Sequence, residues 1–392
     1  MNIMGIVCAA TLLVLGGLGL APVKSIERVF VDFDFANLVL HGVLGLLLFA
    51  GAMFVDVQQL RRWARPIAAL ASAGVVIAAF VVAFLLWIVA FLVGVDLPFI
   101  WCLLFGALIS PTDPIAALAI VKKSNAPKQM EIKLVGESLF NDATGVMLFM
   151  VILGVIITGD ISPELLAHEL FIAPVGAAVL GWLLGMLATR AISHVNHHPT
   201  EILITLALAC GVYGLSEAIH VSAPIAVVAA GMVIGHRARH HAMTEETRQH
   251  LDVFWEGLDE VINATLFVLI GLALVIVDLD WRIVTLGVIT WMIVLIGRWA
   301  SVSIVLFPMH HRGGVGVGTT KVMVWGGLRG GISLALALSL PKGELSNNLV
   351  ALTFIVVGLS SAIQGMTLSR VIPKQVQADV REESQVVQES IS

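Results

Sequence analysis

Residues 67–93 read IAALASAGVVIAAFVVAFLLWIVAFLV, an apolar run without a single charged side chain. A helix needs about 20 mostly apolar residues to cross a bilayer, so this run can span a membrane even when it is tilted. Its apolarity is continuous, whereas the strands of a membrane β-barrel alternate between apolar and polar residues. The stretch therefore predicts a transmembrane helix.

The rest of the chain has the same character. Of its 392 residues, 58% are hydrophobic and 12% are charged, and the mean hydropathy is +0.98. A soluble protein of this length could not hide so much apolar surface from water. Lipid must be the solvent for most of the chain, which excludes soluble enzymes, nucleic-acid-binding proteins, fibrous proteins and disordered chains. The three cysteines each lie in an apolar run and are interpreted as core residues, not as a disulfide or metal set.

Twelve segments are predicted to span the membrane, which makes the chain an all-α polytopic membrane protein. They are residues 3–22, 37–55, 67–93, 97–120, 132–157, 170–192, 200–219, 221–235, 259–276, 283–307, 319–340 and 347–369. Residues 3–22 begin without a basic residue, so we interpret them as a retained helix and not a cleaved signal peptide. The charged stretch 243–260 is expected to form a surface helix that leads into the next span. Residues 1–372 are predicted to form one transmembrane domain, and the polar residues 373–392 a cytoplasmic tail.

The placement of lysine and arginine orients these spans. With the N-terminus in the cytoplasm, sixteen of the 22 basic residues, Lys133 among them, are assigned to inner loops and four to outer loops. Cytoplasmic loops carry the excess of basic residues in membrane proteins, so both termini are predicted to be cytoplasmic. The two remaining basic residues, Arg298 and Arg329, fall within spans.

Ionisable side chains inside spans are costly and usually functional. The acids are Asp113, Glu137 and Asp142 in the core of their spans, with Glu217 near the outer end of its span, and the bases are Arg298 and Arg329. Three acids against two arginines leave one acid without a fixed cation. In a site of low dielectric constant, that acid must take a proton or hold a mobile cation. This is the requirement for a carrier that exchanges a cation for protons.

Asp113 lies in the motif SPTDP at residues 110–114. Its two prolines fall inside an apolar span and should break the helix. Broken helices are tolerated in membranes where they line a cavity, and their freed carbonyls and dipole ends bind ions. The alternative is a simple kink near the cytoplasmic end of the span, which would need no aspartate.

Glu137, Ser138, Asn141 and Asp142 lie in the motif GESLFND at residues 136–142. Their spacing places all four on one face of a helix. All four offer oxygen, the ligand type that hard monovalent cations prefer. The alternative is a polar seam that joins helices, but two carboxylates about one turn apart fit such a seam poorly because they repel each other.

A third motif, WGGLRGG at residues 325–331, surrounds Arg329 with four glycines and predicts a second irregular segment. Arg298 lies about sixteen positions into its span, too deep for snorkelling to the surface. Eight histidines gather on the side assigned to the cytoplasm, where they are interpreted as solvated loop residues, with pH sensing as the alternative. They are His194, His197, His198, His236, His240, His241, His310 and His311. No HExxH, GxSxG or phosphate-binding motif is present, so neither an enzyme nor a cofactor is predicted.

Three strings resemble the NhaP-type sodium/proton antiporters, bacterial relatives of the eukaryotic sodium/proton exchangers. They are SPTDPIAALAI at 110–120, GESLFNDATGVMLF at 136–149 and WGGLRGGISLALALSLP at 325–341, with a weaker match in LLLFAGAMFVDVQQL at 46–60. The resemblance covers nearly the whole chain apart from the tail. It implies an inverted-repeat antiporter fold with two crossing unwound helices, a dimerisation domain, a mobile core domain and an elevator-like alternating-access cycle. Residues 1–372 would then form the cation/proton exchanger domain.

The resemblance also implies a cation site, residue by residue. Asp142 matches the carboxylate that carries the cation and the proton. Asn141 matches its partner in an Asn-Asp pair similar to that of the electroneutral branch. Thr112 and Asp113 match the site residues of the unwound helix, and Ser138 matches a ligand. Transported Na⁺ would then be held by Asp142, Ser138 and Thr112.

The resemblance further implies a structural ion pair. Glu137 matches a structural residue that pairs with an arginine, for which Arg298 is the first choice and Arg329 the second. The chain departs from the family pattern in two respects. The family usually has thirteen helices, and some relatives carry a carboxylate where this chain has Ala50.

We therefore predict a secondary antiporter of the cell inner membrane that exchanges Na⁺ for H⁺, electroneutrally and as a homodimer, and serves pH homeostasis. The first alternative is K⁺/H⁺ exchange, since oxygen ligands alone do not separate Na⁺ from Li⁺ or K⁺. The second is an intramembrane aspartyl protease with Asp113 and Asp142 as its dyad, although nearby arginines would hold both aspartates ionised and prevent a shared proton. A channel or a non-transporting sensor is a third alternative. Besides these ions, membrane lipid is the expected partner, and nucleic acid is not.

Overall fold

The computed structural model describes residues 42–124, 126–160, 163–195, 197–239, 242–274, 281–310 and 317–374. In these residues the elements are helices, and the β-type pairing is one isolated antiparallel bridge between Asp113 and Leu328. Six helices are long and apolar enough to cross a membrane, and three apolar helices are shorter. The predicted all-α membrane fold is confirmed, whereas the count of twelve spans stays a prediction. The predicted span 3–22 lies outside the described residues, as does the predicted tail 373–392 beyond its first two residues.

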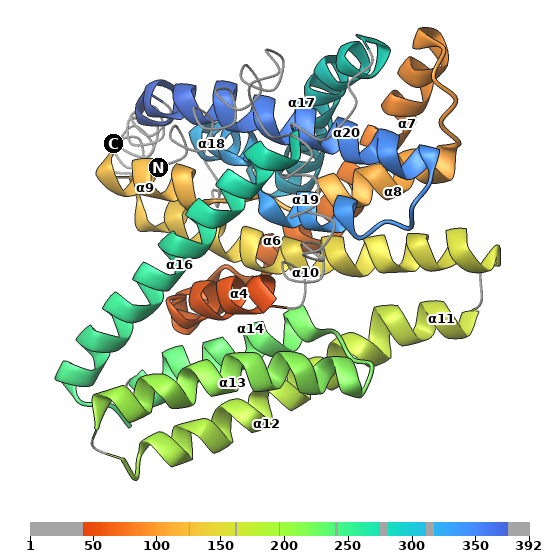
Figure 1. Cartoon of the computed structure of the whole chain (residues 1–392). Helices are drawn as coiled ribbons and strands as arrows, with labels where there is room; N and C mark the ends of the chain where they lie inside the picture. Colours follow the sequence, from red (N-terminus) through yellow and green to blue (C-terminus); the bar gives the residue numbers. More distant parts are fainter. Residues whose placement is uncertain are drawn as a thin grey trace, which may run out of the picture. The chain divides into compact units, whose positions relative to one another are not determined.

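The described helices belong to two compact units. The helices of the first unit are α4 (Leu44–Met53), α5 (Val57–Arg62, all but its last residue), α11 (Pro163–Ala167), α12 (Ala173–Ile192), α13 (His198–Ala218), α14 (Ala223–Val233) and α16 (Glu245–Leu274). Helices α12, α13 and α14 lie side by side, and α4 packs against α14 and α16 (Figure 1). A Cβ atom added to Gly231 of α14 would lie 2.8 Å from the carbonyl oxygen of Phe49 in α4. Such small residues allow membrane helices to approach closely.

The second unit contains the broken helices. Its elements are α6 (Ala64–Ala69), α7 (Val75–Val93), α8 (Phe99–Ile109), α9 (Ile115–Lys123), most of α10 (Lys128–Thr158), α17 (Trp281–His310), α18 (Val317–Gly326), α19 (Gly331–Leu338) and α20 (Glu344–Leu359). Helix α7 packs against α8 and α17, and α20 packs against α17 and α19. Single π-helical turns at Leu70–Gly74 and Ser360–Gln364 continue α6 into α7 and extend α20 toward its end. The long apolar helices Ala64–Val93 and Glu344–Lys374 result.

Two helices of the second unit break where the sequence predicts. Residues 110–114 separate α8 from α9, and residues 327–330 separate α18 from α19. The first break contains two prolines, and the second lies among glycines, so neither can continue a regular helical hydrogen-bond pattern. The two segments meet, because the backbone N–H of Asp113 donates to the carbonyl oxygen of Leu328 at 2.8 Å. The two crossing unwound helices that the resemblance implies are therefore present.

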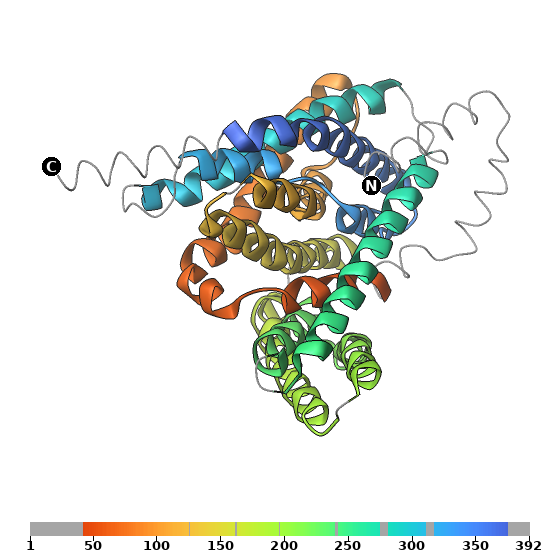
Figure 2. The same ribbon diagram turned by 90° about the vertical axis from the view of Figure 1, so that its left-hand side faces the viewer.

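The charged stretch 243–260 leads into the next predicted span. All but its first two residues belong to α16, which runs unbroken from Glu245 to Leu274 (Figures 1 and 2). The side chains of Leu251 and Trp255 on this helix are fully buried. The charged residues therefore cover only one side of a helix whose other side packs into the unit.

Candidate cation site

Two side chains of α10 hold the broken segment between α8 and α9. Asn141 donates from Nδ2 to Oγ1 of Thr112 at 2.8 Å, and Ser138 donates from Oγ to the carbonyl oxygen of Thr112 at 2.6 Å. All three residues are buried, Asn141 completely. Three of the predicted site residues therefore converge on one point of the unwound segment.

Glu137 and Arg298 form a buried ion pair between α10 and α17. Nη1 of Arg298 donates to Oε1 of Glu137 at 2.5 Å, and Nη2 donates to Oε2 at 2.7 Å. The Arg298 side chain is only 7% exposed and the Glu137 side chain only 2%. Such a two-pronged pair is the strongest form of charge-assisted hydrogen bond. Of the two arginines that the sequence offered as partners, the structure places Arg298 on Glu137.

The Arg298 guanidinium is also anchored to the second broken helix. Its Nε and Nη2 atoms donate to the carbonyl oxygen of Met323 in α18 at 3.2 and 3.0 Å. A Cβ atom added to Gly327 would lie 2.8 Å from Nε of Arg298. Glycine at this position therefore leaves the space that the guanidinium occupies.

Arg329 performs a different task from Arg298. Its Nη1 atom donates to the carbonyl oxygens of Ser110 and Pro111 at 2.7 and 3.2 Å. These carbonyls lie where α8 ends and the segment unwinds, so a regular helix no longer supplies their hydrogen-bond donors. The buried guanidinium of one broken helix thus satisfies the freed carbonyls of the other.

Asp142 is the buried carboxylate of this region with an unsatisfied oxygen. Its side chain lies on α10 next to Asn141, and the residue is only 8% exposed. Among the described residues, its buried Oδ1 atom has no hydrogen-bond partner. A buried, ionised carboxylate without a hydrogen-bond partner on one oxygen is unfavourable, whereas a bound proton or cation would satisfy that oxygen. Asp113 lies in the unwound segment, close to Gly330. A Cβ atom added to Gly330 would lie 3.1 Å from the Cβ atom of Asp113.

Lys133 corrects one sequence-based assignment. It was counted among the basic residues of an inner loop, but it lies within α10 and is only 2% exposed. Its ammonium nitrogen lies 4.0 Å from the centre of the Trp63 ring, a cation–π contact. A basic residue near the end of an apolar span can therefore be buried without entering the ion pair of the site.

Ser360 and Gln364 support the site and were not predicted. The backbone N–H of Arg329 donates to Oγ of Ser360 at 3.2 Å, and this hydroxyl donates to Oε1 of Gln364 at 2.7 Å. Gln364 in turn donates from Nε2 to the carbonyl oxygen of Trp325 at 3.1 Å. The sequence signal that could have found them is a glutamine one turn after a serine inside the apolar span 347–369.

Helices that unwind around buried carboxylates in a bundle of apolar helices are typical of secondary transporters. The chain matches the family model described as sodium/hydrogen exchanger, transmembrane, over residues 3–374, and it therefore belongs to this family. The resemblance inferred from the sequence motifs is confirmed.

Individual relatives agree with this assignment. The chain is 42% identical over 358 residues to the Na⁺/H⁺ antiporter NhaP of Pseudomonas aeruginosa. The matched region covers 90% of this chain and 84% of that protein. It is also 36% identical over 289 residues to the Na⁺/H⁺ antiporter NhaH of Halobacillus aidingensis. That matched region covers 71% of this chain and 70% of the relative. The fold is similar to that of the sodium proton antiporter MjNhaP1 from Methanocaldococcus jannaschii, with a TM-score of 0.75 and 19% identity over 96% of this chain and all of that one.

Proposed function

We propose that this protein exchanges Na⁺ for H⁺ by alternating access, with Asp142 as the group that carries either ion. The observation that carries the proposal is the buried, unsatisfied Oδ1 atom of Asp142 beside the unwound helices. The relatives named Na⁺/H⁺ antiporters support the choice of ions.

The neighbours of Asp142 supply further oxygen ligands to the proposed site. Ser138 and Thr112 contribute a hydroxyl each, and Na⁺ is a hard cation that prefers oxygen. Asn141 and Asp113 complete the group, Asn141 by holding Thr112 in place through the 2.8 Å hydrogen bond. In this proposal Glu137 does not bind the cation, because Arg298 already takes both of its oxygens.

We propose an electroneutral exchange of one ion for one proton. Asn141 stands beside Asp142 where a second carboxylate would add another charge, so a single carboxylate alternates between the two ions. The positive charge of Arg329, which is bound to backbone carbonyls, remains in both states of the cycle.

A transporter accounts for this region better than an aspartyl protease does. A protease dyad needs two carboxylates that share one proton. A nearby cation that stabilises the ionised form of both carboxylates prevents this sharing. The buried guanidinium of Arg329 is fastened to the same unwound segment that carries Asp113, at Ser110 and Pro111. This arrangement opposes a shared proton.

We further propose that the protein resides in the cell inner membrane as a homodimer with both termini in the cytoplasm. The excess of lysine and arginine in alternate loops supports the orientation. Cysteine labelling from either side of intact cells, at positions placed in an inner and an outer loop, tests it.

Exchange itself is tested with everted membrane vesicles in which a dye reports the pH gradient. Na⁺, Li⁺ and K⁺ are added in turn, and we expect Na⁺ to dissipate the gradient in vesicles with the parent protein but not with Asp142→Asn. A response to K⁺ alone would replace the proposal with K⁺/H⁺ exchange. Proton flux that continues without any counter-cation would indicate a channel. Dependence of the rate on the membrane potential would contradict electroneutrality.

A further inference from the structure

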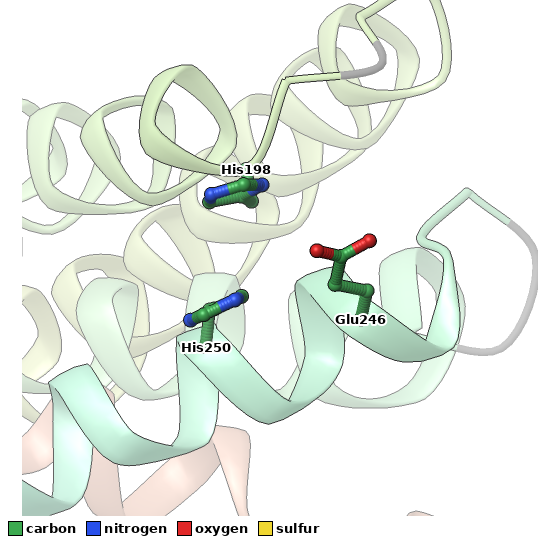
Figure 3. Close-up of side chains that lie close together, drawn as sticks. All are labelled: His198, Glu246 and His250. Atoms are coloured by element: carbon green, nitrogen blue, oxygen red, sulfur yellow. The ribbon is translucent and has the colours of Figure 1, made fainter.

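A cluster of metal-binding side chains lies in the first unit, at the start of two helices. His198 is the first residue of α13, and Glu246 and His250 lie one turn apart on α16. One ligand atom from each of the three lies within 4.8 Å of the others. Figure 3 shows the two imidazole rings stacked and the carboxylate of Glu246 beside them; the ring centroids are 4.5 Å apart and the planes differ by 15°.

These ligand types select a class of metal. Imidazole nitrogen and carboxylate oxygen suit Zn²⁺ and neighbouring transition metals, whereas Ca²⁺ and Mg²⁺ prefer oxygen alone. Ligands four residues apart on a helix lie on one face and can bind one ion together. Glu246 and His250 have this spacing, and His198 adds a third ligand from another helix. Three protein ligands leave the fourth position of a tetrahedral Zn²⁺ ion to water.

A buried carboxylate next to this cluster provides an independent observation. Glu201 lies on α13 one turn after His198, is only 1% exposed, and its Oε2 atom has no hydrogen-bond partner among the described residues. Its other oxygen accepts from Oγ1 of Thr247, the residue after Glu246, at 3.5 Å. In the described part of the chain, no lysine or arginine forms an ion pair with Glu201.

A buried carboxylate without a lysine or arginine partner is unfavourable, and a divalent cation nearby would supply a fixed positive charge. Carboxylates just outside the ligand set commonly orient metal-bound histidines. The position of Glu201, one turn from His198, fits this role.

We propose that His198, Glu246 and His250 bind one divalent ion of the Zn²⁺ class, which ties the start of α13 to the start of α16. Both helix starts lie on the side that the basic residues assign to the cytoplasm. The three residues belong to the first unit and the cation site to the second, so this proposal does not depend on the proposed exchange.

The first test measures Zn²⁺ binding to untagged protein in detergent, in competition with a chromogenic chelator. We expect one Zn²⁺ per chain in the parent, and about a tenfold or greater loss of affinity in His198→Ala and His250→Ala, since even changes outside the ligand set cost that much. His194→Ala is the matched control, because this exposed histidine contacts the carbonyl oxygen of Arg190 and is not part of the cluster. Asp142→Asn should keep the Zn²⁺ site. Unchanged affinity and stoichiometry in the double variant of His198 and His250 would overturn the proposal.

The second test keeps the protein folded by changing the exposed Glu246 to glutamine. Zn²⁺ should raise the melting temperature of the parent, because an ion that binds the folded state stabilises it, and should raise that of Glu246→Gln much less. X-ray absorption of the Zn²⁺-loaded parent should report nitrogen and oxygen ligands at about 2.0–2.1 Å. An equal rise in both proteins, or sulfur ligands in the spectrum, would contradict the assigned ligand set.

Discussion

Both carboxylate oxygens of Glu137 accept hydrogen bonds from the guanidinium of Arg298, at 2.5 and 2.7 Å. The pair joins α10, which carries the proposed cation ligands, to α17. Arg298 extends the connection to α18 through the carbonyl oxygen of Met323. One arginine thus fixes the helix of the site against the second broken helix, and this predicts a structural role for Glu137.

Replacing Glu137 with alanine should destabilise the protein before it alters transport chemistry. Removing one partner of a buried pair leaves an uncompensated charge, at a loss of about 3–5 kcal/mol in the free energy of unfolding. We expect a clearly lower melting temperature in detergent. Adding Arg298→Met should restore part of the stability, because the unpaired charge is then gone.

The matched control for that experiment combines Glu137→Ala with Arg329→Met. Arg329 donates to the carbonyl oxygens of Ser110 and Pro111 and not to Glu137, so its removal should lower stability further. If both double variants melt at or below the temperature of Glu137→Ala, the assigned pairing is wrong.

Gly327→Ala should disturb the same arginine from the other side. The new Cβ would lie 2.8 Å from Nε of Arg298 and 3.3 Å from the carbonyl oxygen of Met323. Overpacking of this kind costs about 1–3 kcal/mol, and we expect a lower melting temperature together with slower exchange.

Gly358→Ala is the control for the added methyl group. Gly358 lies in α20, and its Cβ would have no atom within 4 Å, so stability should stay the same or rise because alanine is the better helix former. Equal stability losses in the two variants would show that space around Arg298 is not the cause.

Asp142→Asn should abolish exchange in a protein that still folds. The change keeps the size of the side chain but removes the charge that would bind Na⁺ or H⁺ alternately, and a neutral residue is easier to insert into a membrane. Asp142→Glu keeps the charge and should retain some exchange with altered cation affinity. The measurement is dye-monitored exchange in everted vesicles with equal amounts of each variant. Robust exchange by Asp142→Asn would refute the role of this carboxylate.

Much of the fold could be predicted because its signals are local. Long apolar runs predict the helices, and prolines around Asp113 and glycines around Arg329 predict the two breaks that the structure contains. The convergence of Ser138, Asn141 and Thr112 was predictable only through the family resemblance, since the bonds join segments that are distant in sequence.

Other features depend on tertiary packing and could not be read from the sequence alone. The choice between Arg298 and Arg329 as partner of Glu137 is made by contacts between distant segments. Arg298 donates to Glu137, whereas Arg329 donates to the carbonyl oxygens of Ser110 and Pro111. The positive charge of Lys133 favours a loop, but the residue lies buried in α10 with its ammonium group over the Trp63 ring.

The last prediction concerns competition between protons and Na⁺. If Asp142 binds either ion but never both, only the deprotonated carboxylate accepts Na⁺, so acid must weaken apparent Na⁺ affinity. Where the site is mostly protonated, one-proton linkage predicts a tenfold weakening per pH unit. Initial rates measured against Na⁺ concentration at several pH values should therefore show a rising half-saturation concentration toward acid pH and a maximal rate that excess Na⁺ restores.

The competing explanation is that protonation of the histidines on the side assigned to the cytoplasm switches the carrier off. A histidine switch would act away from the Na⁺ ligands, so excess Na⁺ could not reverse it. The two mechanisms thus differ in which kinetic parameter changes with pH. A maximal rate that collapses at low pH while the half-saturation concentration stays constant would reject competition at Asp142. Replacing His194 and His197 with glutamine should leave the pH profile unchanged under competition, because neither side chain is a proposed Na⁺ ligand.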